Sequence, residues 1–339
     1  GHGEYSYFDS TVSGLSNGGF KTEDMLKQAT YETYDFDSVW TIQEGVSYPY
    51  FKGMDPLLPG TIVDDGTVNA LAGLGTAEKP YRISRYRDLK YVGKYEYATN
   101  LHYKLTANIN AYPSFTENCN ADSTLCKGFE PIPAFSGVFQ SNGKIIGHLN
   151  INRPDADSVG LFRALAPTAQ VSSIVIDTSS QFTGDDWDYQ RNTRKPFIRG
   201  RNYVGALAGF DSGLDLDKVF VNADVSGADY VGGIVGKKSS GSIARSASMG
   251  SVTGSNYVGG LAGSMSSVAV SDCYSISGVA GETDVGGLVG YSYKSTVQNV
   301  YASNSIEAKS KWGGLAGEVV SSTFATAYFD STQWAVDFS

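Results

Sequence analysis

The sequence predicts an all-β protein, a parallel β-helix (β-solenoid) made of 27-residue coils. The motif VGALAG, which begins at Val204, recurs in variant form at Val231, Val258, Val285 and Trp312, each copy 27 residues after the last. A fixed period of this length is typical of chains that stack similar turns. No part of the repeat has the i, i+3, i+4, i+7 apolar spacing of an amphipathic helix. The 40 glycines and 22 tyrosines suit a strand-rich chain with tight corners.

Three apolar columns repeat with the motif when its first residue is numbered position 0. They lie at positions +3, +12 and +21, about nine residues apart. We therefore expect a three-sided coil with one short strand on each side and glycine at the corners. Rungs stacked at ~4.8 Å would bury each column residue, which stabilises the coil by ~1.5–3 kcal/mol per residue. The columns contain Leu207, Ile234, Leu261, Leu288 and Leu315; Leu216, Ile243, Val270, Val297 and Phe324; Val225, Val252, Val279 and Ile306.

Two files of aromatic residues are expected on the outside of the coils. Position +16 is aromatic in four of five copies, and strand alternation directs it outward. A second file precedes position 0, at Tyr203, Tyr230 and Tyr257. Glycan binding by Tyr274 and Tyr301 of the first file is one interpretation. The alternative is that neighbouring rings stack on each other and stabilise the sheet.

The period is interrupted once, by a predicted loop. Val159 opens a related pattern 45 residues before Val204, which is one coil plus 18 residues, and the surplus is expected between Gln181 and Arg201. Loops on a rigid scaffold concentrate function, so we predict a ligand site here. Its acids could bind Ca²⁺, although no spacing matches an EF-hand, and otherwise no cofactor is expected. The alternative is a self-paired loop that packs its tryptophan on the rod. The candidate residues are Asp185, Asp186, Trp187, Asp188 and Tyr189.

Short helices and a small covalent ring are expected before the regular coils. Helices are predicted after Ser84 and after Thr22, and both would cover open core at the end of a solenoid. Cys119 and Cys126 bracket a polar loop and could form a disulfide, which indicates an oxidising compartment; two unrelated thiols are the alternative. Cys273 falls in a repeat column and is expected in the core.

A repeated pentapeptide suggests the domain organisation. The sequence YFDST occurs at residues 7–11 and again at 328–332, directly after the last coil. Residues 1–54 therefore resemble the closing and capping segment of a preceding module. We expect a linker over 55–79, the opening of a second module with a capping helix and irregular coils over 80–157, and regular coils over 158–339.

Composition and charge exclude several classes of protein. The net charge of −9 gives no surface for neutralising nucleic-acid phosphates, and no apolar run reaches the 18 residues of a membrane span. Any secretion signal would lie outside this sequence. The three histidines stand beside no Ser/Asp constellation, so nucleophilic catalysis is poorly supported.

The most charged repeat column, position +14, does not predict a glycosidase. Glycosidases use two carboxylates, and this column has one beside two cations. Arg245 and Asp272, on adjacent coils, are expected to form a solvated ion pair. A lyase that uses the basic residues of this column is the remaining enzymatic interpretation. The column contains Lys218, Arg245, Asp272, Asn299 and Thr326.

The repeats VGGIVG, VGGLAG and VGGLVG resemble the GLUG motif of large bacterial surface and secreted proteins. Phrases at residues 40–50, 75–83 and 135–139 resemble the flanks of such modules. The resemblance implies a right-handed β-helix, akin to filamentous-haemagglutinin-type adhesins, without catalytic residues.

The expected function is a non-enzymatic structural or adhesive segment of a large bacterial cell-surface or extracellular protein. Such segments could assemble end to end into a filament, a homopolymer, and could contact a surface glycan or a host surface. The alternative is a carbohydrate-binding or carbohydrate-active β-helix protein of the lyase or glycosidase kind.

Overall fold

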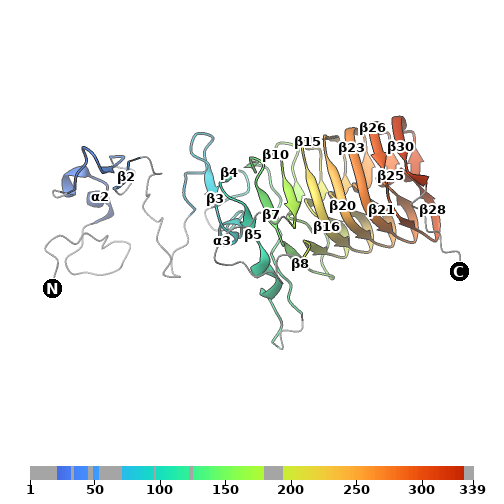
Figure 1. The fold of residues 1–339 in the computed structure, drawn as a ribbon, viewed down its shortest axis with the longest axis horizontal. Coiled ribbons are helices and arrows are strands. Elements are labelled where there is room, and N and C mark those ends of the chain that lie inside the picture. The colour runs from blue at the N-terminus through green and yellow to red at the C-terminus, as the bar shows by residue number, and fades with distance from the viewer. Residues whose placement is uncertain are drawn as a thin grey trace. The chain divides into compact units, whose positions relative to one another are not determined.

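The computed structural model describes residues 21–31, 34–44, 49–52, 71–94, 97–121, 125–178 and 194–331. The chain divides into two compact units, Gly1–Leu74 and Gly75–Ser339. The second unit is a parallel β-solenoid, which confirms the predicted fold class (Figure 1). The module boundaries at residues 54, 79 and 157 stay predictions.

The described part of the first unit contains only short elements. The helix expected after Thr22 is divided into α2 (Thr22–Met25) and the 3₁₀ helix η1 (Gln28–Thr30). Strands β1 (Trp40–Thr41) and β2 (Tyr50–Phe51) then pair in an antiparallel ladder.

The opening coils of the second unit are irregular and have an aromatic core. Tyr103, Phe135, Phe139 and Phe162 are at most 1% exposed and pack with ring centroids 5.0–6.2 Å apart. The elements are β3 (Tyr81–Ile83), α3 (Tyr86–Leu89), β4 (His102–Leu105), β5 (Ile109–Asn110), η2 (Tyr112–Thr116), β6 (Val138–Gln140), β7 (Ile145–Gly147), β8 (Asn150–Asn152), β9 (Phe162–Leu165), β10 (Gln170–Ser172) and β11 (Val175–Asp177).

The regular coils contribute to three parallel sheets that run along the rod (Figure 1). One sheet contains β13 (Asn202–Gly205), β17 (Asp229–Gly232), β21 (Asn256–Gly259), β24 (Thr283–Gly286) and β28 (Ser310–Gly313). A second contains β9, β14 (Ala208–Asp211), β18 (Val235–Lys238), β22 (Ala262–Ser266), β25 (Val289–Tyr293) and β29 (Ala316–Val320). The third and largest also includes β12 (Phe197–Arg199), β15 (Leu216–Asp217), β16 (Phe220–Ser226), β19 (Gly241–Ala244), β20 (Ala247–Thr253), β23 (Val268–Ala280), β26 (Thr296–Ala302), β27 (Ile306–Glu307) and β30 (Thr323–Phe329).

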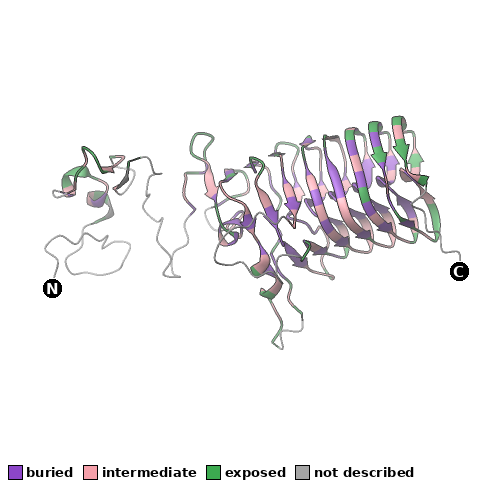
Figure 2. Ribbon diagram, viewed as in Figure 1, coloured by how far each residue is buried: buried purple, intermediate pink, exposed green. Residues whose placement is uncertain are grey.

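The three predicted apolar columns form the core of these coils, as the buried residues of Figure 2 show. Leu207, Ile243 and Val252 are fully buried, and their column neighbours in the inner coils are at most 3% exposed. Each column residue faces its counterpart in the next coil, one period away, as Val252 faces Val279. In the last coil Leu315 and Phe324 are only half-buried, because the described residues place no coil beyond them.

The prediction of glycine at the corners is confirmed only in part, at Gly227, Gly254 and Gly281, which lie in the turns between successive strands. Two corners of every regular coil, at positions −1 and +14, are non-glycine residues with φ between 47° and 58°. The motif glycines instead allow adjacent backbones to approach each other. A Cβ on Gly233 would lie 2.2 Å from the carbonyl oxygen of Gly260, and one on Gly236 would lie 2.5 Å from the nitrogen of Val204. The left-handed corners persist because stacked neighbours hold each of them in the same conformation.

The surplus residues lie where the period predicted a loop. Val175 pairs with Phe220, which is one period plus the surplus further along the chain, whereas Phe197 pairs with Asp224, a single period on. The insertion therefore lies between β11 and β12. Residues from Phe197 onward already belong to a coil strand, so the loop ends slightly earlier than the predicted limit at Arg201.

Candidate functional site

The predicted loop site lies outside the described residues. This applies to Asp185, Asp186, Trp187, Asp188 and Tyr189, and so Ca²⁺ binding there stays a prediction. The described residue Arg194 marks the return of the loop. Its guanidinium lies 5.0 Å from the ring centroid of Phe115, and its carbonyl oxygen lies 2.7 Å from Nδ1 of His148.

The tyrosine file before position 0 forms a continuous ring stack. Tyr203 and Tyr230 are 4.9 Å apart with planes at 10°, and Tyr230 and Tyr257 are 4.8 Å apart at 11°. The ammonium group of Lys237 lies 5.5 Å from the Tyr230 centroid. Burial raises the pKa of the Tyr230 hydroxyl, so the ring stays neutral at physiological pH. Both faces of Tyr230 are covered by its neighbours, which favours a stabilising role over sugar stacking.

Tyr274 and Tyr301 make the same kind of stack in the other file. Their centroids are 5.1 Å apart, their planes differ by 6°, and Tyr301 is 44% exposed. Each ring therefore covers one face of the other. Glycan binding by this pair stays a prediction. A glycan would contact the outer face of each ring and the ring edges, because the inner faces cover each other.

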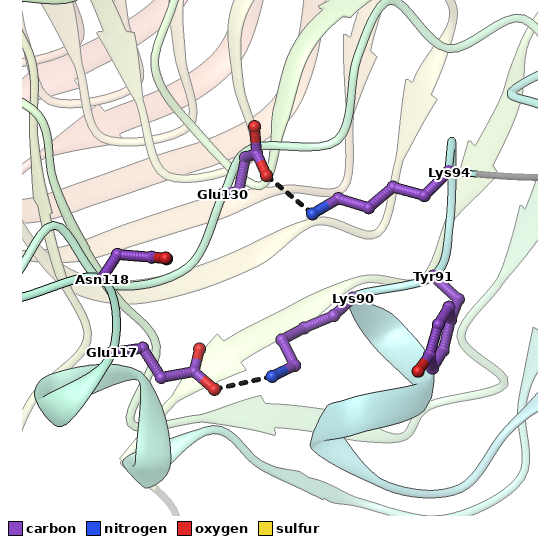
Figure 3. Close-up of a pocket in the computed structure, with 6 residues that line it drawn as sticks. All are labelled: Lys90, Tyr91, Lys94, Glu117, Asn118 and Glu130. Carbon is purple, nitrogen blue, oxygen red and sulfur yellow. Dashed lines mark hydrogen bonds and ion pairs between the residues drawn. The ribbon is translucent and has the colours of Figure 1, made fainter. Parts of the chain in front are cut away.

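A polar pocket of about 310 Å³ lies beside the short helix α3 (Figure 3). Asp88 fixes the start of this helix, since its Oδ2 accepts hydrogen bonds from the backbone N–H groups of Ser84 and Arg85, each at 3.0 Å. The cap residue is Arg85, one position after the predicted Ser84. The pocket is lined by Lys90, Tyr91, Lys94, Glu117, Asn118 and Glu130.

Two ion pairs cross this pocket and neutralise its charges. Lys90 Nζ lies 2.7 Å from Glu117 Oε1, and Lys94 Nζ lies 2.6 Å from Glu130 Oε2. The hydrogen bond from Lys94 lowers the pKa of Glu130, so this carboxylate stays ionised. The Tyr86 hydroxyl donates to Glu117 at 2.5 Å, and burial raises its pKa. All four charged side chains are thus engaged with each other, and the pocket connects α3 to the segment around Glu117 and Glu130.

The segment beside the pocket contains the covalent ring. Cys119 and Cys126 are joined by a disulfide in the structure. Asn120 N–H also donates to the Leu125 carbonyl at 2.9 Å. Cys273 is buried in the core, and burial raises the pKa of its thiol to about 11, which leaves it protonated and unreactive.

The prediction of an ion pair between Arg245 and Asp272 is wrong. Arg245 Nη2 instead lies 2.6 Å from Asp217 Oδ1, on the preceding coil. Asp272 accepts a hydrogen bond from Asn299 Nδ2 at 3.2 Å. Position +14 has a left-handed backbone in every regular coil, between β19 and β20 at Arg245 and within β23 at Asp272, and this bend interrupts the strand alternation that would direct its side chains.

Sequence reasoning missed one pair of charges in the core. Asp211 and Lys238 occupy position +7 of adjacent coils, and both side chains are 0% exposed. In the next two coils the same position holds Met265 and Ser292. The apolar side chain of Met265 is the signal in the sequence that this position faces inward.

Comparisons with known proteins agree with this architecture. Residues 281–307 match the family described as the GLUG motif. A stretch of 174 residues, 50% of this chain, is 32% identical to halomucin of Haloquadratum walsbyi, and the match spans 2% of the length of halomucin. A solved structure from Bacteroides ovatus, named as a candidate immunoglobulin A1 protease, is similar at a TM-score of 0.57 and 15% identity. The match covers 78% of this chain and 79% of that one.

The chain contains a GLUG motif on a parallel β-helix, so the resemblance of its repeats to this motif is confirmed. At 15% identity the solved structure shows the fold alone. The motif and the halomucin match indicate a surface or extracellular β-helix protein.

Two features are absent from the described residues. None of their helices has the length and apolar character that crossing a bilayer requires. The same residues contain no group of three or more His, Cys, Asp or Glu side chains placed to hold a metal ion.

Proposed function

We propose that this chain is a non-enzymatic structural or adhesive segment of a large surface or extracellular protein, and that its last coil is a docking edge for end-to-end assembly. The observation that carries the proposal is the unbroken register of the regular coils. Val204, Val231, Val258, Val285 and Trp312 pair in one ladder. A ladder of this kind gives a rod whose length is set by the number of coils.

Polar side chains on the coils support the structural role, because they bond to the next coil. Ser251 Oγ donates to Asp224 at 2.8 Å and Asn256 Nδ2 donates to Asp229 at 2.7 Å. Ser242 Oγ donates to Asp215 at 2.8 Å. Each of these bonds joins residues one period apart. Polar groups engaged along the rod in this way stiffen it, and they are not free to converge on a substrate.

The last coil supports the docking edge. Strands β28, β29 and β30 each pair with the preceding coil, and in the described residues nothing pairs with their other side. Val319 and Phe329 are 47% exposed, and Tyr328 is 66% exposed. Unpaired backbone groups beside exposed apolar side chains are a ready template for another strand.

The occupant that fits this edge is the closing segment of a second copy, residues 1–54. Residues 7–11 of this segment repeat residues 328–332, which include the end of the last coil strand β30. A segment that follows this sequence in one module is therefore suited to cover the last coil of another.

The assembly is tested by sedimentation velocity of the full chain over a range of concentrations. We expect association that is lost in the variants Val319→Lys and Phe329→Lys, because a buried lysine opposes the apolar contact. A chain that begins at residue 55 should lose it as well. Ile276→Lys is the matched control, since Ile276 is 41% exposed on the side of the rod. A full chain that stays monomeric at every concentration, or equal loss in the Ile276 variant, would contradict the docking edge.

A further inference from the structure

The buried charges at position +7 lie in an apolar column between two coils. Asp211 is the last residue of β14 and pairs directly with Lys238, the last residue of β18. On the two outer sides the column continues with Leu165, which pairs with Asp211, and with Met265, which pairs with Lys238. Both charged side chains are 0% exposed, so water does not screen them.

The contacts of the pair place an amine beside an activated carboxyl group. Lys238 Nζ lies 2.6 Å from Asp211 Oδ2 and also donates to the carbonyl oxygen of Leu214. The other carboxyl oxygen, Oδ1, accepts the backbone N–H groups of Gly213 and Leu214, each at 2.9 Å. The carboxyl carbon is one bond beyond Oδ2, so this hydrogen bond holds Nζ next to the atom that it would attack.

Burial favours the uncharged form of the Lys238 amine. It lowers the pKa of Lys238, although the nearby carboxylates of Asp211 and Asp215 oppose this effect. Transfer of one proton from Nζ to Oδ2 removes both charges from the apolar interior. The neutral amine that remains is a nucleophile.

We propose that Lys238 and Asp211 condense into an intramolecular isopeptide bond that joins two adjacent coils covalently. After the proton transfer, the Nζ lone pair attacks the carboxyl carbon. The negative charge develops on Oδ1, where the N–H groups of Gly213 and Leu214 stabilise it as an oxyanion hole does. A second Nζ proton passes to Oδ2, the bond from the carboxyl carbon to Oδ2 breaks, and water leaves.

The reaction balances without a co-reactant. An ammonium group and a carboxylate give an amide and one water molecule, and nothing is oxidised or reduced. The remaining amide N–H keeps the hydrogen bond to the Leu214 carbonyl that the ammonium group makes in the structure.

The chain contains a matched pair that isolates the effect of burial. Lys309 and Glu282 are also one period apart, with Nζ 2.7 Å from Oε1, but their side chains are 76% and 55% exposed. Water stabilises both charges there and competes for the carboxyl group, so this pair is expected to stay ionic.

Mass spectrometry of the full chain tests the proposal. We expect the intact mass to be lower by one water molecule than the sequence and disulfide require. Trypsin should then release residues 202–218 linked to residues 238–245, with no cleavage after Lys238. The variants Lys238→Arg, which keeps the charge, and Lys238→Met, which keeps the size, should have their full mass.

Several outcomes would overturn the isopeptide bond. Free peptides 202–218 and 239–245 from the folded wild-type chain would show that the pair is ionic only. A water loss confined to peptide 202–218 would indicate cyclisation of an aspartate instead. Equal cross-linking of Lys309 to Glu282 would show that burial does not direct the reaction.

Discussion

The opening coils and the regular coils are parts of one solenoid that are held together differently. In the opening part the spacing between paired residues changes from coil to coil, as Tyr81 pairs with Tyr103 while His102 pairs with Val138. From β12 onward each strand pairs with the strand of the next coil at one constant period. Irregular coils are filled by large interlocking rings, whereas regular coils repeat Leu, Ile and Val in columns between glycine-rich turns.

The difference shows that a coil is interchangeable only when its backbone repeats. A column residue such as Leu261 fits between any two coils that have the same register, because its neighbours are always the residues one period away. Phe139 fits only one place, because its ring partners Phe135 and Phe162 do not lie one period away from it in the sequence.

Removal of a whole coil is expected to give the largest difference between the two regions. Deletion of residues 258–284 joins Tyr257 to Val285 in the same register, so we expect a folded protein whose Tm falls by roughly 5 °C. Deletion of residues 138–164, equal in length, removes Phe139 and Phe162 and should abolish cooperative unfolding. Thermal unfolding followed by circular dichroism measures both. Similar behaviour of the two deletions would show that the regular coils are not interchangeable.

Addition of a single methyl group is expected to give a smaller difference in stability between the two regions. In the regular part, a Cβ on Gly260 would lie 2.0 Å from Ser275 Oγ and 2.2 Å from the Gly287 carbonyl oxygen. Gly260→Ala is therefore expected to lower the free energy of unfolding by about 3 kcal/mol. In the opening part, Gly143 has no heavy atom within 4 Å of the added Cβ but has φ +69°. Gly143→Ala should lower stability by only ~1 kcal/mol.

Urea unfolding of both glycine variants gives the comparison. A larger loss for Gly143→Ala than for Gly260→Ala would mean that backbone conformation outweighs the close approach of adjacent coils.

The smallest effect is expected at the junction of the two regions. Asp157, before the insertion, accepts two hydrogen bonds from Arg201, after it, at 2.8 and 2.7 Å. The hydrogen bond from Arg201 lowers the pKa of Asp157, so the stabilisation is present above the usual aspartate pKa of ~3.9 and is lost as pH falls through the lower value. Because both side chains are exposed, Asp157→Asn should lower stability by less than ~1 kcal/mol at neutral pH.

Urea unfolding of this variant and the wild type at neutral pH and near pH 2 checks the sign. The difference between them should shrink in acid; a difference that grows there would contradict the assignment to this ion pair.

The amino-acid sequence was sufficient for the parts of the structure that repeat. Leu207 and its column and the place of the insertion follow from period and residue type, since each depends on neighbours at a known spacing. The Arg245–Asp217 pair could not be predicted, because it depends on how the left-handed backbone at position +14 directs side chains between coils.

By itself the sequence determined that this protein is a stack of parallel coils, since a 27-residue period places like residues over like. Only the tertiary structure decided which polar residues face inward and what the glycines do. Asp211 and Lys238 are core residues because the strand ends β14 and β18 turn them into an apolar column. The motif glycines are needed where backbones of adjacent coils meet. Both results depend on contacts between residues of neighbouring coils, which no single coil contains.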